Sequence, residues 1–221
     1  MVNVKLFNDI RKTLSEKGVK LIAVSKTKPI EDIDSLYNEG QRVFGENRVQ
    51  ELSAKYEALP KDIEWHLIGH LQTNKVKYIS PFISLIHSVD SLSLLTEINR
   101  QALKNNRVID CLLQFHIAVE ETKFGLNLEE AAEILGSEAF KKMLNIRMVG
   151  VMGMASFTEN IELVRSEFKN LKNIFDTLKT QFFHSEGSFD EISMGMSGDY
   201  EIAVEEGSTS VRIGSLLFGE R

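Results

Sequence analysis

The 221-residue sequence has little of what builds disulfide-rich, fibrous or membrane proteins. Its one cysteine, Cys111, excludes an intramolecular disulfide and a multi-cysteine metal site. With 3 prolines and 14 glycines, it contains no collagenous or linker-rich segment. It also lacks the run of about 18 apolar residues that a membrane span requires. A basic excess is missing too: the formal net charge is -6, which disfavours a nucleic-acid partner.

These absences leave an ordinary globular composition, 43% hydrophobic and 26% charged. Residues 1–14 alternate charged and apolar residues, so no signal peptide is predicted. Cys111 lies in the apolar stretch 109–113 and is interpreted as a small buried hydrophobic residue. We therefore expect a cytoplasmic protein. No strongly apolar exposed helix face stands out, so we expect a monomer.

Short apolar runs alternate with amphipathic stretches along the whole chain. Strands are predicted over 20–25, 42–45, 65–69, 83–87, 108–117, 146–151, 191–193 and 210–213. Helices are predicted over 30–39, 47–56, 73–79, 91–104, 128–135, 160–182 and 199–205, with an extra N-terminal helix over 2–17. This alternation predicts a parallel sheet in an α/β protein, and the chain length suits a barrel. We predict a single domain over 1–221, a TIM-like (β/α)8 barrel; a doubly wound open sheet is the alternative.

Two glycine- and serine-containing turns follow the last two predicted strands. Their sequences are Ser193-Met-Gly-Met-Ser197-Gly-Asp and Arg212-Ile-Gly214-Ser215. Turns of this kind expose backbone N–H groups and hydroxyls, and barrels commonly bind phosphate between the loops after strands seven and eight. We predict a phosphate site here. The alternative is that the glycines only permit tight turns.

Lys26 directly follows the first apolar strand, so its amine is expected at the mouth of the barrel. Burial favours the neutral form of a lysine amine, which is the form that attacks an aldehyde to form an imine. The alternatives are a solvated Lys26, or Lys28 in its place, although Pro29 biases Lys28 toward an extended loop outside the mouth. A lysine opposite a phosphate site is what pyridoxal phosphate requires.

Arg212 lies in the last predicted strand, beside the second turn. A guanidinium there could face a pyridine nitrogen, which must then stay unprotonated. The alternative is a salt bridge to Glu205 or Glu206. No metal site is predicted, because His66 and His70 lie in or beside a strand, where i, i+4 positions are about 13 Å apart.

At these residues the sequence resembles the pyridoxal-phosphate homeostasis protein family. The matching segments are Ala23-Val-Ser-Lys-Thr-Lys-Pro29, Phe44-Gly-Glu-Asn-Arg-Val-Gln-Glu51, Trp65-His-Leu-Ile-Gly-His-Leu-Gln-Thr-Asn-Lys75, Lys123-Phe-Gly125, Gly150-Val-Met-Gly-Met154, Ser193-Met-Gly-Met-Ser197 and Val211-Arg-Ile-Gly-Ser-Leu-Leu-Phe-Gly219. The resemblance implies a barrel similar to the N-terminal domain of alanine racemase. It implies pyridoxal 5′-phosphate held as a Schiff base on Lys26, with Arg212 at the pyridine nitrogen. It further implies Asn47 beside the cofactor and phosphate contacts around Ser193, Gly214 and Ser215.

The resemblance also implies a carrier or reservoir in vitamin B6 balance without robust catalysis, whose partners include apo forms of pyridoxal-phosphate enzymes. The rival function is an amino-acid racemase of the same fold. A racemase needs two opposed acid/base groups, and all four tyrosines, Tyr37, Tyr56, Tyr78 and Tyr200, fall in predicted helices. We expect no β-rich segment of the kind that covers the site in alanine racemase to follow the barrel. A third hypothesis is a regulator that reports cofactor availability to a protein partner.

Overall fold

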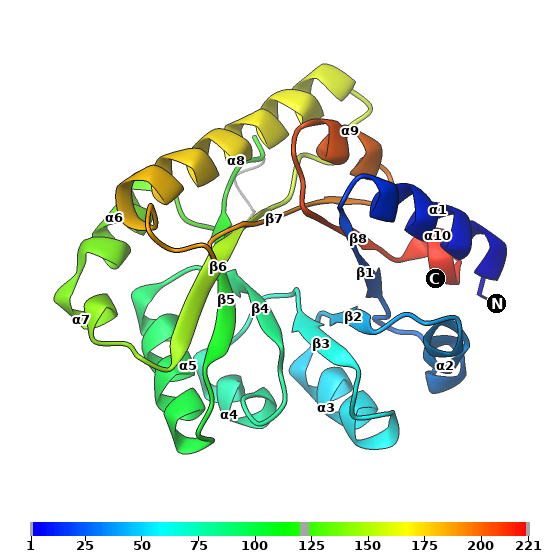
Figure 1. Ribbon diagram of the computed structural model, residues 1–221, viewed down its shortest axis with the longest axis horizontal. Helices are drawn as coiled ribbons and strands as arrows, with labels where there is room; N and C mark the ends of the chain where they lie inside the picture. Colours follow the sequence, from blue (N-terminus) through cyan, green and yellow to red (C-terminus); the bar gives the residue numbers. More distant parts are fainter. Residues whose placement is uncertain (1, 120–123, 220–221) are drawn as a thin grey trace.

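The computed structural model describes residues 2–119 and 124–219 as a closed barrel of eight parallel strands (Figure 1). The strands are β1 (Lys20–Val24), β2 (Val43–Glu46), β3 (Glu64–Leu67), β4 (Leu85–Val89), β5 (Ile109–Phe115), β6 (Ile146–Gly153), β7 (Glu191–Met196) and β8 (Ser210–Ile213). Each strand pairs with the next, and β1 also pairs with β8, from Lys20 opposite Ser210 to Ala23 opposite Ile213. The predicted (β/α)8 barrel is thereby confirmed and the open sheet is excluded.

Helices surround the barrel. They are α1 (Val4–Glu16), α2 (Ile30–Asn38), α3 (Val49–Ala58), the 3-10 turn η1 (Thr73–Lys75), α4 (Val76–Ile79), α5 (Leu92–Lys104), α6 (Leu128–Gly136), α7 (Glu138–Lys141), α8 (Ile161–Phe182), α9 (Tyr200–Glu205) and α10 (Ser215–Phe218). The predicted helices are present, with the stretch 73–79 divided between η1 and α4. The short helices α7 and α10 were not predicted, because four residues are too few to show a helical period.

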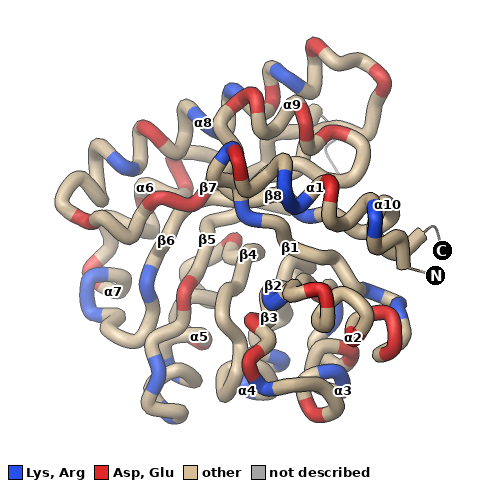
Figure 2. The backbone as a smooth tube through the Cα atoms, turned by 45° about the vertical axis from the view of Figure 1, so that its right-hand side comes forward, with Lys and Arg blue, Asp and Glu red and all other residues tan. Residues whose placement is uncertain are grey.

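The buried side chains form two apolar clusters. The larger one fills the space between the strands and the helices, and Trp65, Phe44 and Phe168 are among its largest members. The smaller one joins Leu85, Leu112, Val149 and Met152 from β4, β5 and β6. Alternate residues of a barrel strand point inward and outward, so each strand contributes to both sides. The outer helices carry lysine and arginine interspersed with acidic residues (Figure 2).

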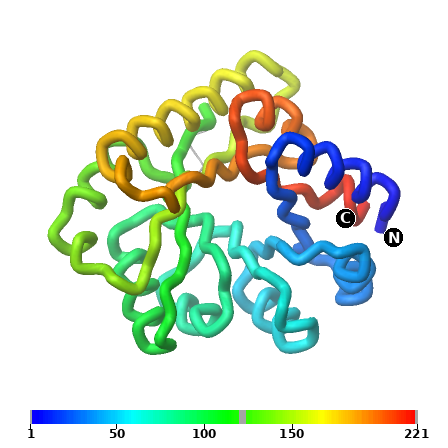
Figure 3. The backbone as a smooth tube through the Cα atoms, in the orientation of Figure 1, coloured from blue at the N-terminus to red at the C-terminus, as the bar shows by residue number. Residues whose placement is uncertain are grey.

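The extra N-terminal helix was predicted, and it lies against the last helix of the chain. The backbone N–H of Asn3 donates to the carbonyl of Leu217 over 2.8 Å, and α1 contacts α10. Figure 3 shows the two ends of the chain side by side. The first and last βα units are therefore neighbours, and residues that follow β1 and β8 share one side of the barrel mouth.

Candidate functional site

A cavity of about 750 Å³ opens at the carboxyl ends of the strands. Its lining comes from the segments after β1, β2, β3, β6, β7 and β8, where a barrel of this kind carries its active site. The lining residues are Val24, Lys26, Thr27, Lys28, Asn47, Ile68, Met154, Ser156, Phe157, Thr158, Glu159, Val164, Met196, Ser197, Gly198, Asp199, Arg212, Gly214, Ser215 and Gly219. Five of the six predicted site residues are among them, and Ser193 is not.

Lys26 lies in the cavity wall just beyond β1, partly buried, and belongs to the segment that connects β1 to α2. Lys28 also lines the cavity, so proximity to Pro29 does not carry it away from the mouth. Its Nζ donates to the carbonyls of Phe218 at 3.2 Å and Gly219 at 2.9 Å. Two lysines therefore lie in this wall, and the amine of Lys28 is hydrogen-bonded to the backbone at the end of α10.

Arg212 enters the cavity from β8 and is buried, with 4% of its surface exposed. Its Nη1 donates to Oγ of Ser193 at 2.6 Å, and its Nη2 donates to the carbonyl of Gly153 at 3.0 Å. The alternative partners Glu205 and Glu206 instead pair with Arg165. The guanidinium is thus oriented from within the barrel rather than by an outer carboxylate.

Behind Arg212, a chain of buried hydrogen bonds runs across the barrel. Oγ of Ser193 lies 3.1 Å from Nδ1 of His87, and Nε2 of His87 lies 3.0 Å from Nδ1 of His66. Because a guanidinium only donates, Ser193 accepts from Arg212, and its hydroxyl is also hydrogen-bonded to Nδ1 of His87. Nε2 of His87 is in turn hydrogen-bonded to Nδ1 of His66. We call these four residues, Arg212, Ser193, His87 and His66, the histidine chain.

Burial keeps both imidazoles neutral. It lowers the pKa of His66 to about 3, with a smaller contribution from the charge of Lys20. Burial also lowers the pKa of His87 well below its usual value, helped by His66, Arg212 and Lys20. The pKa of Arg212 falls to about 10 for the same reason, while Asp199 opposes the shift. At neutral pH the histidine chain therefore holds one positive charge, at its cavity end.

The two predicted phosphate turns meet on the opposite side of the cavity from β3. The backbone N–H of Gly214 donates to Oγ of Ser197 at 3.2 Å, which joins the turn after β8 to the turn after β7. Asp199 holds the first turn, because its Oδ1 accepts from the N–H of Met196 at 2.5 Å. An added Cβ at Gly198 would meet no atom within 4 Å, so the cavity continues beside this backbone. The arrangement presents backbone N–H groups and hydroxyls to one space.

Ser193 lies elsewhere than predicted. The predicted strand ended at this residue, but β7 continues to Met196, which places Ser193 in mid-strand with none of its surface exposed. Gly195 permits the longer strand: its φ is +94°, and a Cβ there would come within 2.5 Å of Cβ of Ala203. The hydroxyl of Ser193 consequently contacts Arg212 from inside the barrel. Ser197 is the serine that lies in the turn after β7.

Asn47 follows β2 and lines the cavity. Its Oδ1 is buried and has no hydrogen-bond partner among the residues that the structure describes. A buried amide oxygen without a partner is costly in a folded protein, which makes it a candidate contact for a bound molecule.

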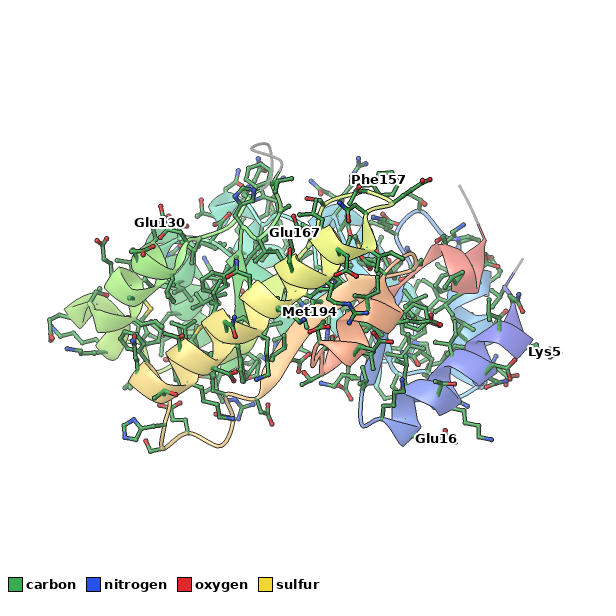
Figure 4. The ribbon with its side chains drawn as sticks, turned by 90° about the horizontal axis from the view of Figure 1, so that it is seen from above. Lys5, Glu16, Glu130, Phe157, Glu167 and Met194 are labelled. Carbon is green, nitrogen blue, oxygen red and sulfur yellow. The ribbon has the colours of Figure 1, made fainter. Side chains whose placement is uncertain are left out.

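None of the six predicted site residues comes from the loop between β6 and α8. Ser156, Phe157, Thr158 and Glu159 line the cavity, and Phe157 is 97% exposed (Figure 4). Buried Glu167 of α8 holds this loop by accepting from the N–H and the hydroxyl of Ser156, each at 2.7 Å. A glutamate on the apolar face of an amphipathic helix, between Val164 and Phe168, is the signal that could have revealed it.

The sequence disfavoured a metal site, a membrane span and a catalytic role for Cys111. Among residues 2–119 and 124–219, no group of three or more His, Cys, Asp or Glu side chains could hold a metal ion. Within the same ranges, no helix has the length and hydrophobicity of a membrane span. Cys111 is fully buried, and burial raises the pKa of its thiol, as expected for a packing residue. Lys123, which belongs to one matching segment, lies outside the described residues.

Sequence comparison places this chain among proteins of known type. The family model for the alanine racemase N-terminal domain matches residues 6–221. The pyridoxal phosphate homeostasis protein of Aquifex aeolicus is 46% identical over 207 residues, which is 93% of this chain and 89% of that protein. The protein of the same name from a Synechocystis strain is 37% identical over 223 residues, covering 100% of both chains.

Solved structures give the same result. PipY of Synechococcus elongatus, determined without PLP, superposes with a TM-score of 0.90 at 34% identity, covering 97% of this chain and 99% of that one. PipY with PLP bound gives a TM-score of 0.85 at the same identity and coverage. An alanine racemase from Clostridium difficile, at 16% identity and a TM-score of 0.73, shares the fold over 98% of this chain and 55% of its own. The chain belongs to the pyridoxal phosphate homeostasis protein family, whose barrel is that of the alanine racemase N-terminal domain.

Proposed function

We propose that this protein binds pyridoxal 5′-phosphate covalently through Nζ of Lys26. The observation that carries the proposal is that Lys26, Arg212 and the joined turns after β7 and β8 line one cavity. The residues suit the group, because Asn47 contributes an unpartnered buried oxygen and the open space beside Gly198 leaves room for a phosphate. The bound form of PipY, a relative at 34% identity, supports the same choice of cofactor.

Each wall of the cavity has a distinct role in this proposal. Nζ of Lys26 would hold the cofactor by a bond to its aldehyde carbon, with the aldehyde oxygen leaving as water. The backbone and hydroxyls of Ser197, Gly198, Gly214 and Ser215 bind the phosphate. Arg212 would face the ring nitrogen, and its positive charge would disfavour protonation there. Bound pyridoxal phosphate supplies an electron sink, which an unprotonated ring nitrogen weakens.

We propose further that the protein carries the cofactor rather than catalysing a reaction with it. The tyrosines of α2, α3, α4 and α9 are absent from the described cavity lining, so none is placed opposite Lys26 as a second acid/base group. Phe157, which lines the cavity from the loop after β6, is exposed to solvent. Efficient catalysis generally needs water to be excluded from the site. The recipients are then apo forms of pyridoxal-phosphate enzymes, met in the cytoplasm by a monomeric carrier.

The covalent link is tested by absorption spectroscopy of the purified protein, with Lys26→Ala and Lys28→Ala compared. A band near ~420 nm in the wild type and in Lys28→Ala, absent from Lys26→Ala, is the expected result. Borohydride reduction should fix the label on Lys26. A wild-type protein that cannot be loaded with the cofactor would overturn the proposal.

The carrier role is tested separately from binding. Loaded protein is mixed with an apo-enzyme, and recovery of that enzyme's activity is followed with and without a trap for free cofactor. Recovery that persists with the trap supports direct transfer. Turnover of alanine enantiomers by the loaded protein would instead identify a racemase.

A further inference from the structure

Three charged residues, two of them buried and the third partly exposed, form an ionic cluster under the first loop of the barrel mouth. Nζ of Lys55, on the inner face of α3, lies 2.7 Å from Oε1 of Glu46 and 2.7 Å from Oε1 of Glu51. The side chains of Lys55 and Glu46 are 7% and 0% exposed. We call Lys55, Glu46 and Glu51 the Lys55 cluster.

The Lys55 cluster holds the backbone on both sides of Lys26. Before it, Nζ of Lys55 donates to the carbonyl of Ser25 at 2.7 Å, and Oγ of Ser25 donates to Oε1 of Glu46 at 2.6 Å. After it, the N–H of Thr27 donates to Oε1 of Glu51 at 2.6 Å. Lys26 is thus placed between two residues that the same cluster fixes.

Thr27 shows that this support is needed. Its φ is +64°, in the left-handed region, which is strongly disfavoured for a β-branched residue. Such a conformation persists where surrounding contacts impose it, and these conformations gather at functional sites. The bond from Thr27 to the Glu51 carboxylate is a contact that imposes it, directly beside Lys26.

Packing alone does not explain the Lys55 cluster. Burial raises the pKa of Glu46, against the opposing effects of Lys55 and Ser25. Its Oε2 is buried without a hydrogen-bond partner among the described residues. Buried ion pairs often stabilise a fold less than apolar residues of the same volume, so their use here indicates a requirement for defined geometry.

We propose that the Lys55 cluster positions Lys26 for bond formation with the aldehyde carbon of pyridoxal phosphate. Lys55, Glu46 and Glu51 are positioning residues in this arrangement, since they fix Ser25 and Thr27 rather than contact the reacting atoms. This inference rests on the proposed function of Lys26.

The test follows the rate at which the ~420 nm band appears after cofactor is added to apo protein. Glu51→Ala removes the acceptor of the Thr27 N–H, and the expected result is a rate roughly tenfold lower than in the wild type, because displaced reacting groups lose effective concentration. Glu51→Gln keeps an acceptor oxygen and is expected to restore most of the rate. Peptide mapping after borohydride reduction should show part of the label moved from Lys26 to other lysines in Glu51→Ala.

Lys55→Met tests the role of the Lys55 ammonium in positioning Lys26. If this variant does not fold, the double variant Glu46→Gln/Lys55→Met is measured in its place. Lys172→Met is the matched control, because Lys172 also forms an i, i+4 ion pair, with Asp176, but on the surface. Thermal melting is measured for every variant. A purely structural role predicts lower melting temperatures with wild-type rates and all label on Lys26, and that result would overturn the inference.

The failure of this inference is distinguishable from failure of the proposed function. If the wild type loads on Lys26 and the cluster variants load equally fast, only the positioning role is wrong. If the wild type does not load, or loads at another lysine, the proposed function and the inference fall together.

Discussion

The two sides of the cavity hold their key residues in contrasting ways. On the β1–β2 side, the neighbours of Lys26 are held by a cluster of three charges, Lys55, Glu46 and Glu51. On the β7–β8 side, Arg212 donates to the neutral groups Ser193 and the Gly153 carbonyl, and the neutral His87 and His66 support Ser193. The two sides also hold different things. On the first side, carboxylates and an ammonium fix a backbone segment, whereas on the second side a buried cation is oriented by neutral acceptors that carry no charge of their own.

The largest expected effect comes from breaking the charged side. Lys55→Met should lower the free energy of unfolding by about 3–5 kcal/mol, because it leaves the buried Glu46 carboxylate without its counter-charge. Urea unfolding monitored by circular dichroism measures the change. Glu46→Gln/Lys55→Met should recover a substantial part of the loss. If the double variant is no more stable than the single one, the loss does not come from the unpaired charge.

The second-largest effect is expected from lowering the pH, which should reduce the stability that the neutral His66 and His87 give to the folded protein. Burial lowers the pKa values of His66, to about 3, and of His87 below the usual 6.5, so the unfolded chain binds more protons once the pH falls below about 6.5. Stability is fully present above that pH and is lost below it, at roughly 1.4 kcal/mol per pH unit for each histidine. Two histidines give a loss of about 2–3 kcal/mol at pH 5.5.

Urea unfolding between pH 7.5 and pH 5 measures this slope. Glu46 has the opposite effect on the pH dependence of stability, because its pKa is raised in the folded protein and protonation removes its buried charge. It is a single group, whereas two histidines make the protein less stable in acid. Replacing both histidines with glutamine should flatten the profile. An unchanged slope in that variant would show that other groups dominate the acid response.

A smaller effect is expected from Ser193→Ala. The substitution removes the hydroxyl that accepts from Arg212 and is hydrogen-bonded to His87, and leaving such buried groups unsatisfied costs about 1–3 kcal/mol. Ser88→Ala is the matched control, because Ser88, next to His87 in β4, is equally buried but its Oγ has no hydrogen-bond partner among the described residues. Equal unfolding free energies for the two variants would contradict the role assigned to the histidine chain.

The smallest effect is expected far from the mouth. Arg147 and Asp110 form a two-bond ion pair between β6 and β5, at 2.7 and 2.8 Å, and the arginine side chain is 54% exposed. Exposed pairs contribute at most about 1 kcal/mol, so Arg147→Met should change the unfolding free energy little. A loss of unfolding free energy as large as that of Lys55→Met would show that burial does not explain the difference between this ion pair and the Lys55 cluster.

The sequence predicted the barrel, because strand and helix periods alternate clearly along the chain, and it predicted that Lys26 and Arg212 lie at the barrel mouth, from their places at strand ends. It did not predict the depth of Ser193, because the strand boundary depended on Gly195, whose left-handed backbone has no periodic signal. The residues that support Lys26 and Arg212 were missed for a related reason. His66 of β3 meets His87 of β4, and Lys55 of α3 meets Glu46 of β2. Spacing along the chain does not report such contacts.

The closure of the barrel between β1 and β8 has a consequence for synthesis on the ribosome. Lys26 is made before Arg212, Gly214 and Ser215. In the proposed function, a nascent chain that ends before β8 has the Lys26 amine but neither the guanidinium nor the second of the two turns that bind the phosphate. Acquisition of the cofactor therefore requires β8 and the turn after it, and a translation product truncated before them would have no complete site for it.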